Sequence, residues 1–119
     1  MITEDFARNF ADEWIKSWNS HDLDRILSHY SEDFSIESPM ALKLLPESKG
    51  LVQGKTAVRA YWSIGLEKIP NLEFQLIDVL TGINGLTIYY SNTATRRKTA
   101  EIMYFNDEQK VNKVFAHYH

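Results

Sequence analysis

The spacing of apolar residues changes at Pro70, and this change constrains the fold more than any other feature of the chain. Before Pro70 the apolar residues mostly recur every three or four positions, as on one face of a helix. After Pro70 they mostly alternate with polar residues, which is typical of half-buried strands. The clearest helical stripe consists of Phe6, Phe10, Trp14 and Trp18. The sequence therefore predicts mainly helices first and a sheet afterwards.

Three helices are expected before Pro70. The first carries the aromatic stripe and has Thr3 as its candidate N-cap. A second, short helix follows a polar break and carries apolar residues from Leu23 to Tyr30. The third begins at Gly54 and ends at Pro70. Its apolar face consists of Val58, Tyr61, Trp62, Leu66 and Ile69.

One strand is expected between the second and third helices. The segment from Asp33 to Ser38 alternates and is stopped by Pro39, so its inward row ends in a hydroxyl. The stretch from Met40 to Gln53 has no clean period and is expected to be a long loop, a feature that is often functional in compact domains.

Four strands in an antiparallel meander are expected after Pro70. They begin at Leu72, with a bulge between Ile77 and Leu80, and Asn84-Gly85 is expected to form a type I′ hairpin turn. The other three strands are Leu86 to Asn92, Lys98 to Phe105, and Val111 to Tyr118.

The order of these elements predicts an α+β fold in which three N-terminal helices pack on one face of a curved antiparallel sheet. A strongly bent sheet closed by helices makes a cone. Aromatic residues form 13% of the chain, which suits a pocket between helices and sheet, although aromatic filling of an ordinary core is the alternative. The length of 119 residues predicts a single domain over residues 1–119.

The net charge and the absence of cysteine limit the expected binding partners and cellular location. The formal net charge is only -3, which does not favour binding to nucleic acid or to an anionic membrane. The chain has no cysteine, and the segment from Met1 to Phe10 lacks the apolar run of a secretory signal or a membrane span. We therefore expect a cytoplasmic protein that does not depend on disulfides.

Four short segments carry a resemblance to a known superfamily. They are Trp14 to Asp24, Tyr30 to Phe34, Glu37-Ser38-Pro39, and Gly54 to Val58. On these segments the chain resembles the SnoaL-like, or nuclear transport factor two-like, superfamily, which includes ketosteroid isomerases and polyketide cyclases. The resemblance implies the cystatin-like cone fold. It does not imply one reaction, because the superfamily hosts several chemistries.

The ketosteroid isomerase pattern gives a position-by-position comparison. The tyrosine of its oxyanion hole falls on Trp14, its basic aspartate falls on Ser38, and its protonated acid falls on Glu101. Only Glu101 keeps a carboxyl group, and a serine is not a base at neutral pH without a helper. The resemblance therefore points to Glu101 as the candidate catalytic residue and away from ketosteroid isomerisation by that mechanism.

The direction of Glu101 is not decided by periodicity, since either row of its strand could face inward. The resemblance implies the inward direction, where desolvation would raise the pKa of the carboxyl group and suit it to proton transfer. The alternative is an outward Glu101 that pairs with Arg96, Arg97 or Lys98.

The remaining candidate site residues line the expected cone. The predicted ligand contacts are Trp14, Trp18, Phe34, Ser38, Tyr61, Trp62, Tyr90, Asn92, Met103, Ala116 and Tyr118. No metal or organic cofactor is implied, because His117 and His119 have the spacing of a chelating pair but no third ligand. His29 is expected to favour the C-terminal end of the second helix, and residues 95–98 are expected to form a solvated turn.

Two functions from different classes remain open at this stage. The first is a pocket protein that acts as an isomerase, lyase or cyclase on a hydrophobic ring compound with a carbonyl or hydroxyl group, using Glu101. The second is a non-catalytic ligand-binding or dimerisation module of the same fold. In either case a homodimer through the outer sheet face is expected, because apolar residues such as Tyr89 and Phe115 lie opposite the inward rows.

Overall fold

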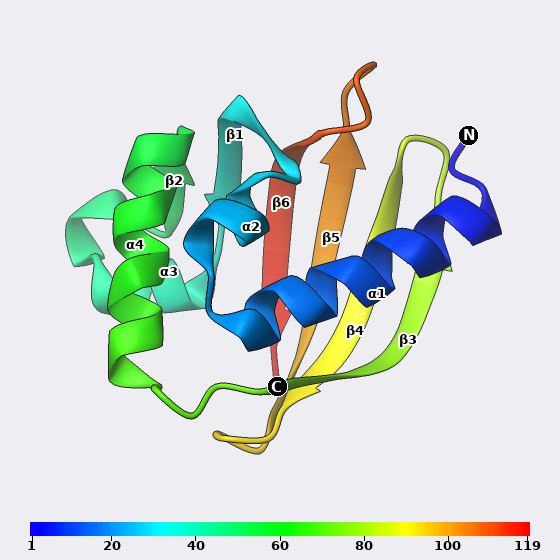
Figure 1. Cartoon of the computed structure of the whole chain (residues 1–119). Helices are drawn as coiled ribbons and strands as arrows, with labels where there is room; N and C mark the ends of the chain where they lie inside the picture. The colour runs from blue at the N-terminus through cyan, green and yellow to red at the C-terminus, as the bar shows by residue number, and fades with distance from the viewer.

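The computed structural model describes residues 1–119 as one curved six-stranded sheet with helices packed against it (Figure 1). The strands are β1 (Tyr30–Glu37), β2 (Leu51–Gln53), β3 (Phe74–Thr81), β4 (Gly85–Asn92), β5 (Arg97–Phe105) and β6 (Val111–Tyr118). The helices are α1 (Glu4–Ser20), α2 (Leu23–Leu27), α3 (Pro39–Leu44) and α4 (Lys55–Lys68), with a short 3₁₀ helix η1 (Pro46–Ser48). The predicted α+β class and curved sheet are confirmed.

The first helix forms as its sequence predicts. The Thr3 side chain accepts a hydrogen bond from the Phe6 amide at 3.1 Å, and the chain leaves the helix at His21 in a left-handed conformation. Trp14 and Trp18 lie on its buried face. Figure 1 shows α1 crossing in front of β3, β4 and β5, while α3 and α4 lie at the end of the sheet formed by β1 and β2.

The sheet has the order β2-β1-β6-β5-β4-β3, so its last four strands form the predicted antiparallel meander. The strand expected from Asp33 to Ser38 joins this sheet, but it pairs with β6 in parallel, with Ile36 opposite Val114. The sheet is therefore mixed rather than wholly antiparallel. Parallel pairing is feasible here because a long stretch of chain connects the two strands.

The segment from Met40 to Gln53 is not the expected loop, and the fold has a fourth helix. Ser38 caps α3 by accepting a hydrogen bond from the Met40 amide at 3.1 Å, and Pro39 occupies the first helical position, where its missing N–H costs nothing. Gly50 then has a φ of 89°, which reverses the chain so that β2 pairs with β1. The cap, the proline and the glycine were visible in the sequence. The segment was nevertheless expected to be a loop, because it has no clear apolar period.

The second helix ends at Leu27, and Tyr30 belongs to β1 rather than to that helix. Tyr30 pairs with Val111 of β6, and its hydroxyl accepts a hydrogen bond from the Trp14 indole at 2.8 Å. Tertiary contacts to a distant strand and to α1 therefore decide the conformation of this residue.

The hairpin between β3 and β4 differs from the expected type I′ turn. Neither Asn84 nor Gly85 has the positive φ that this turn requires, and the Gly82 amide donates to the Gly85 carbonyl at 2.8 Å. Gly85 lies inside β4, where a Cβ atom would approach the Met103 carbonyl oxygen to 2.3 Å. The glycine serves this close approach of two strands. The predicted bulge is present as a register shift between Leu76 and Asp78.

Membrane insertion by a helix finds no support in the fold, since none of the helices combines the length and apolar character needed to cross a bilayer.

Candidate functional site

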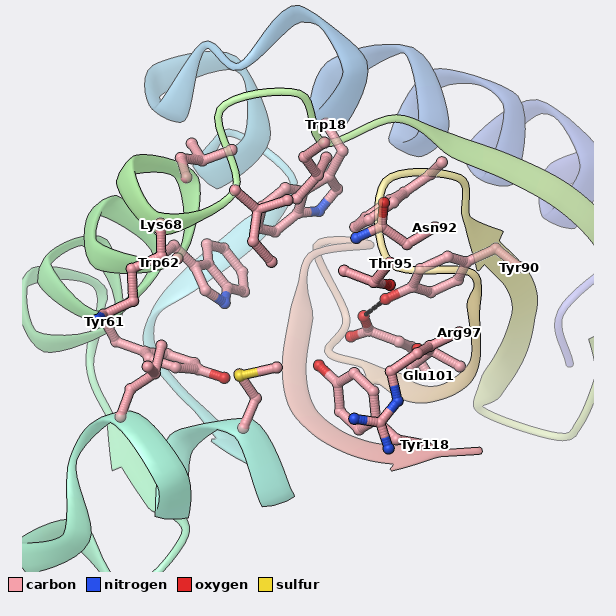
Figure 2. Close-up of a pocket in the computed structure, with 18 of the residues that line it drawn as sticks. Trp18, Tyr61, Trp62, Lys68, Tyr90, Asn92, Thr95, Arg97, Glu101 and Tyr118 are labelled. Atoms are coloured by element: carbon pink, nitrogen blue, oxygen red, sulfur yellow. Dashed lines mark hydrogen bonds between the residues drawn. The ribbon is translucent and has the colours of Figure 1, made fainter.

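A cavity of about 510 Å³ lies between the helices and the inner face of the sheet. Its wall is mostly apolar, and Figure 2 shows Tyr61 and Trp62 of α4 on the side opposite Tyr90, Glu101 and Tyr118 of the sheet. The apolar and aromatic residues of the wall are Trp18, Ile36, Met40, Leu44, Tyr61, Trp62, Leu66, Ile69, Leu72, Phe74, Tyr90 and Tyr118. A cavity of this size and composition suits an apolar small molecule.

Aromatic packing holds the wall in place. The ring of Trp18 meets that of Trp62 edge to face, with centroids 4.9 Å apart and planes at 72°. On the sheet side, Phe74 lies 4.3 Å from Tyr90 between ring centroids. Such pairs stabilise by about 1 kcal/mol each beyond the area that they bury, so the shape of the cavity is set by rigid groups.

Glu101 lies at the inner face of β5 and is 6% exposed. Thr99 and Met103 share its row and are buried too, so this row faces inward. The hydroxyl of Tyr90 donates a hydrogen bond of 2.6 Å to Oε2 of Glu101, drawn as the dashed line in Figure 2. Glu101 is the only carboxyl group among the residues that line the cavity.

The surroundings of Glu101 favour its protonated form. Burial raises the pKa of Glu101 from 4.5 to about 7, and the hydrogen bond from Tyr90 opposes this rise. Burial, followed by the charge of Glu101, raises the pKa of Tyr90 and of Tyr118 well above the usual value for a phenol. Near neutral pH the cavity therefore holds a carboxyl group in both protonation states beside phenols that stay protonated.

A second group of hydroxyls lies near the cavity wall. The hydroxyl of Tyr61 donates to Ser38 Oγ at 3.4 Å, and burial raises the pKa of Tyr61 to about 12. Ser38 itself is 2% exposed and caps α3. The hydroxyl of Ser38 thus bonds to the backbone of α3 and to a neighbouring phenol. Its role is to cap the helix that begins at Pro39.

The cavity brings together about half of the residues predicted from the sequence as ligand contacts. Those that line it are Trp18, Tyr61, Trp62, Tyr90, Asn92 and Tyr118. Those that lie outside its wall, in the core, are Trp14, Phe34, Ser38, Met103 and Ala116. Trp14 donates its indole N–H to Tyr30 and not to Glu101, and the Asn92 side chain accepts from the Ala94 amide in the turn after β4.

Several lining residues were missed by sequence reasoning. Met40, Lys43 and Leu44 belong to α3, which was expected to be part of a loop. Thr95 and Arg97 belong to the segment that was expected to be a solvated turn. The length of the stretch from residue 40 to 53 was the one signal that pointed toward function. The turn carried no such signal, because only the curvature of the sheet brings it to the cavity.

His29 and the C-terminal histidines lie away from the cavity. His29 comes directly after the C-cap residue of α2, as expected, and its Nε2 is 3.1 Å from Ser17 Oγ in the last turn of α1 and 3.5 Å from a carboxylate oxygen of Glu13. Burial lowers the pKa of His29. His117 and His119 are exposed.

The chain belongs to the SnoaL-like domain family, which it matches over residues 11–119. It is similar to a SnoaL-like protein of unknown function from Burkholderia thailandensis, with 42% sequence identity and a TM-score of 0.94. That match covers 99% of this chain and 98% of the other. The predicted membership of the SnoaL-like superfamily is thereby confirmed.

More distant structures share the fold at low sequence identity. AclR, a putative hydroxylase from Streptomyces galilaeus, is 18% identical with a TM-score of 0.77, over 98% of this chain and 80% of that one. SalBIII is an epoxide hydrolase/cyclase-like enzyme with a role in pyran ring formation in the polyether salinomycin. It is 15% identical with a TM-score of 0.76, and the match covers 100% of this chain and 95% of that one. No curated protein matches the chain.

Proposed function

We propose that this protein binds a hydrophobic ring compound in its cavity and transfers a proton to or from it through Glu101, as an isomerase, lyase or cyclase does. The observation that carries the proposal is a single buried carboxyl group on the inner face of the cavity, with a pKa of about 7. General acid–base catalysis is most effective when the pKa of the group lies near the working pH.

The carboxylate form supports isomerisation of an enolisable ketone. Oε1 or Oε2 of Glu101 takes a proton from the carbon next to the carbonyl, the C–H electron pair forms a C=C bond, and the carbonyl π pair moves to the oxygen to give an enolate. The protonated Glu101 then returns the proton to another carbon of the conjugated system. Tyr118 could donate a hydrogen bond to the enolate oxygen, because its phenol stays protonated near neutral pH.

The acid form supports loss or opening of a C–O bond. Protonated Glu101 gives its proton to the oxygen of a leaving hydroxyl or an opening ring ether, and the C–O electron pair stays with that oxygen, while Tyr90 keeps the carboxyl group oriented. In an elimination the resulting carboxylate takes a proton from the neighbouring carbon, whose C–H pair forms the C=C bond. In ring opening or cyclisation a water or a substrate hydroxyl attacks the carbon and gives its proton to the carboxylate. Two distant relatives in fold, a putative hydroxylase and an epoxide hydrolase/cyclase-like enzyme, are compatible with chemistry at oxygenated rings. Their identities are low, so they support the fold and not one reaction.

Deuterium exchange tests the proposal directly. The protein is incubated in deuterated buffer with enolisable monocyclic and fused-ring ketones, and proton NMR follows the loss of the C–H signal next to the carbonyl. The wild type should accelerate exchange of at least one ketone, and Glu101→Gln should lower that rate by about 100-fold or more. Glu108→Gln, in an exposed turn, serves as the matched control and should change nothing.

Proton abstraction by Glu101 is refuted if the Glu101→Gln variant catalyses deuterium exchange of the ketone as fast as the wild type does. Equal binding of a ketone by both proteins without exchange would favour the second candidate function, a non-catalytic ligand-binding module. That candidate gains support from Ser38, which stands where the isomerase base would be and is occupied as a helix cap.

We also propose that the protein forms a homodimer through the outer face of the sheet. Tyr89, Ile102 and Phe115 face away from the helices on three adjacent strands and remain partly exposed, and Tyr104 is 44% exposed. A second copy of this chain would cover this apolar face.

A further inference from the structure

The charged residues that line the cavity are unevenly distributed. Three of them are cationic, namely Lys43 of α3, Lys68 of α4 and Arg97 of β5, and the only acidic one is the buried Glu101. All three cationic residues are exposed, so they lie at the rim rather than inside. This local excess of positive charge contrasts with the net charge of -3 for the whole chain.

The rim cations are not neutralised by neighbouring acidic side chains. The ion pairs of the structure involve Lys16, Arg25, His29, Lys55 and Arg59. Lys43, Lys68 and Arg97 take part in none of them. Arg97 donates its Nε–H to the main-chain oxygen of His119, the last residue of the sequence, at 3.0 Å, which holds the guanidinium group beside Tyr118 (Figure 2).

The interior of the cavity and its rim therefore favour chemically different parts of one ligand. The wall of the cavity is apolar and aromatic and would take an uncharged body. The rim would attract a negative charge that remains in contact with water, where its desolvation cost is small. We infer that the ligand of this cavity is an apolar-bodied anion whose charged end lies at the helical side of the rim, beside Lys43 and Lys68, and whose opposite end reaches Glu101 on the sheet side.

This inference rests on the proposed function and adds the ligand class and its orientation. It places the reacting carbonyl or hydroxyl group at the end of the molecule away from its charge, because Glu101 lies on the buried inner face of the sheet. A carboxylate or another monoanionic group on a ring compound fits this description. The protonated form of Glu101 suits such a ligand, since no second negative charge then lies in the cavity.

Two fluorescent probes with nearly the same body separate charge from apolar binding. Anilinonaphthalene sulfonate carries one negative charge, and N-phenylnaphthylamine is the uncharged counterpart. Both are titrated into the full chain at low and at high salt. The sulfonate should bind more tightly than the uncharged probe at low salt, and added salt should weaken the binding of the sulfonate alone.

Paired substitutions locate the effect at the rim. The double variant Lys43→Gln with Lys68→Gln should raise the Kd of the sulfonate by about 3- to 10-fold and leave that of the uncharged probe unchanged. Arg8→Gln with Lys113→Gln removes the same charge from exposed positions that do not line the cavity and should change neither Kd. Gly65→Leu places a side chain in open space at the cavity wall and should weaken both probes.

The outcomes distinguish this inference from the proposed function. If Gly65→Leu weakens both probes but the rim variant affects the sulfonate no more than the control pair does, the cavity binds ligands and the anionic class is wrong. If Gly65→Leu affects neither probe, the cavity is not the binding site, and both the inference and the proposed function are refuted.

Discussion

Replacing Glu101 by glutamine should stabilise the fold at alkaline pH and leave its stability nearly unchanged at acidic pH. The native carboxyl group is buried, so its ionised form costs free energy in the folded state that it does not cost in the unfolded chain. Glutamine has nearly the same shape and cannot ionise, and its side-chain oxygen can still accept the hydrogen bond from Tyr90.

The sign and size of this effect follow from the two pKa values. Below the unfolded value of 4.5 the carboxyl group is protonated in both states and contributes no pH dependence. Between 4.5 and about 7 the folded state binds more protons than the unfolded state, so the free energy of unfolding falls as pH rises. The full rise in pKa corresponds to about 3 kcal/mol, because one pKa unit is about 1.4 kcal/mol.

The net gain of Glu101→Gln at alkaline pH should therefore be about 3 kcal/mol, because the rise of the pKa to about 7 already includes the opposing hydrogen bond from Tyr90. Urea denaturation of both proteins from about pH 5 to about pH 9 measures it, and the difference between the two curves removes the other titrating groups. A difference that stays constant across this range would refute the reasoning, since it would mean that Glu101 has an ordinary pKa.

Three further predictions concern other parts of the structure. Tyr90→Phe removes the hydrogen bond that lowers the pKa of Glu101, so this pKa should rise above its value of about 7 in the wild type, which carboxyl-carbon NMR titration would detect. An unchanged pKa would contradict this prediction. Gly85→Ala should destabilise by about 2 kcal/mol or more in urea denaturation because its Cβ meets a backbone oxygen, whereas Gly65→Ala, with open space in a helix, should stabilise by about 0.5–1 kcal/mol. Ile102→Lys should convert the proposed dimer to a monomer in light scattering, and a wild type that is already monomeric at micromolar concentration would contradict the assembly.

The elements of the fold could mostly be predicted because their signals are local. The apolar period distinguishes α1 and α4 from the strands of the meander, and Thr3 and Pro70 mark helix ends. Short elements were less predictable. The helix α3 has only six residues, too few to show a period, and Asn84-Gly85 has the composition of a tight turn but lies partly in a strand.

The sequence by itself determined the α+β class, the order of the main elements and, through the resemblance of its motifs, the choice of Glu101 as the candidate acid. Only the tertiary structure decided what surrounds that acid. Tyr90 reaches Glu101 because β4 and β5 pair in one register, and α3 and the start of β5 bring Lys43 and Arg97 to the same cavity. Contacts between residues far apart in the chain depend on strand register and sheet curvature, which no local pattern of residues specifies.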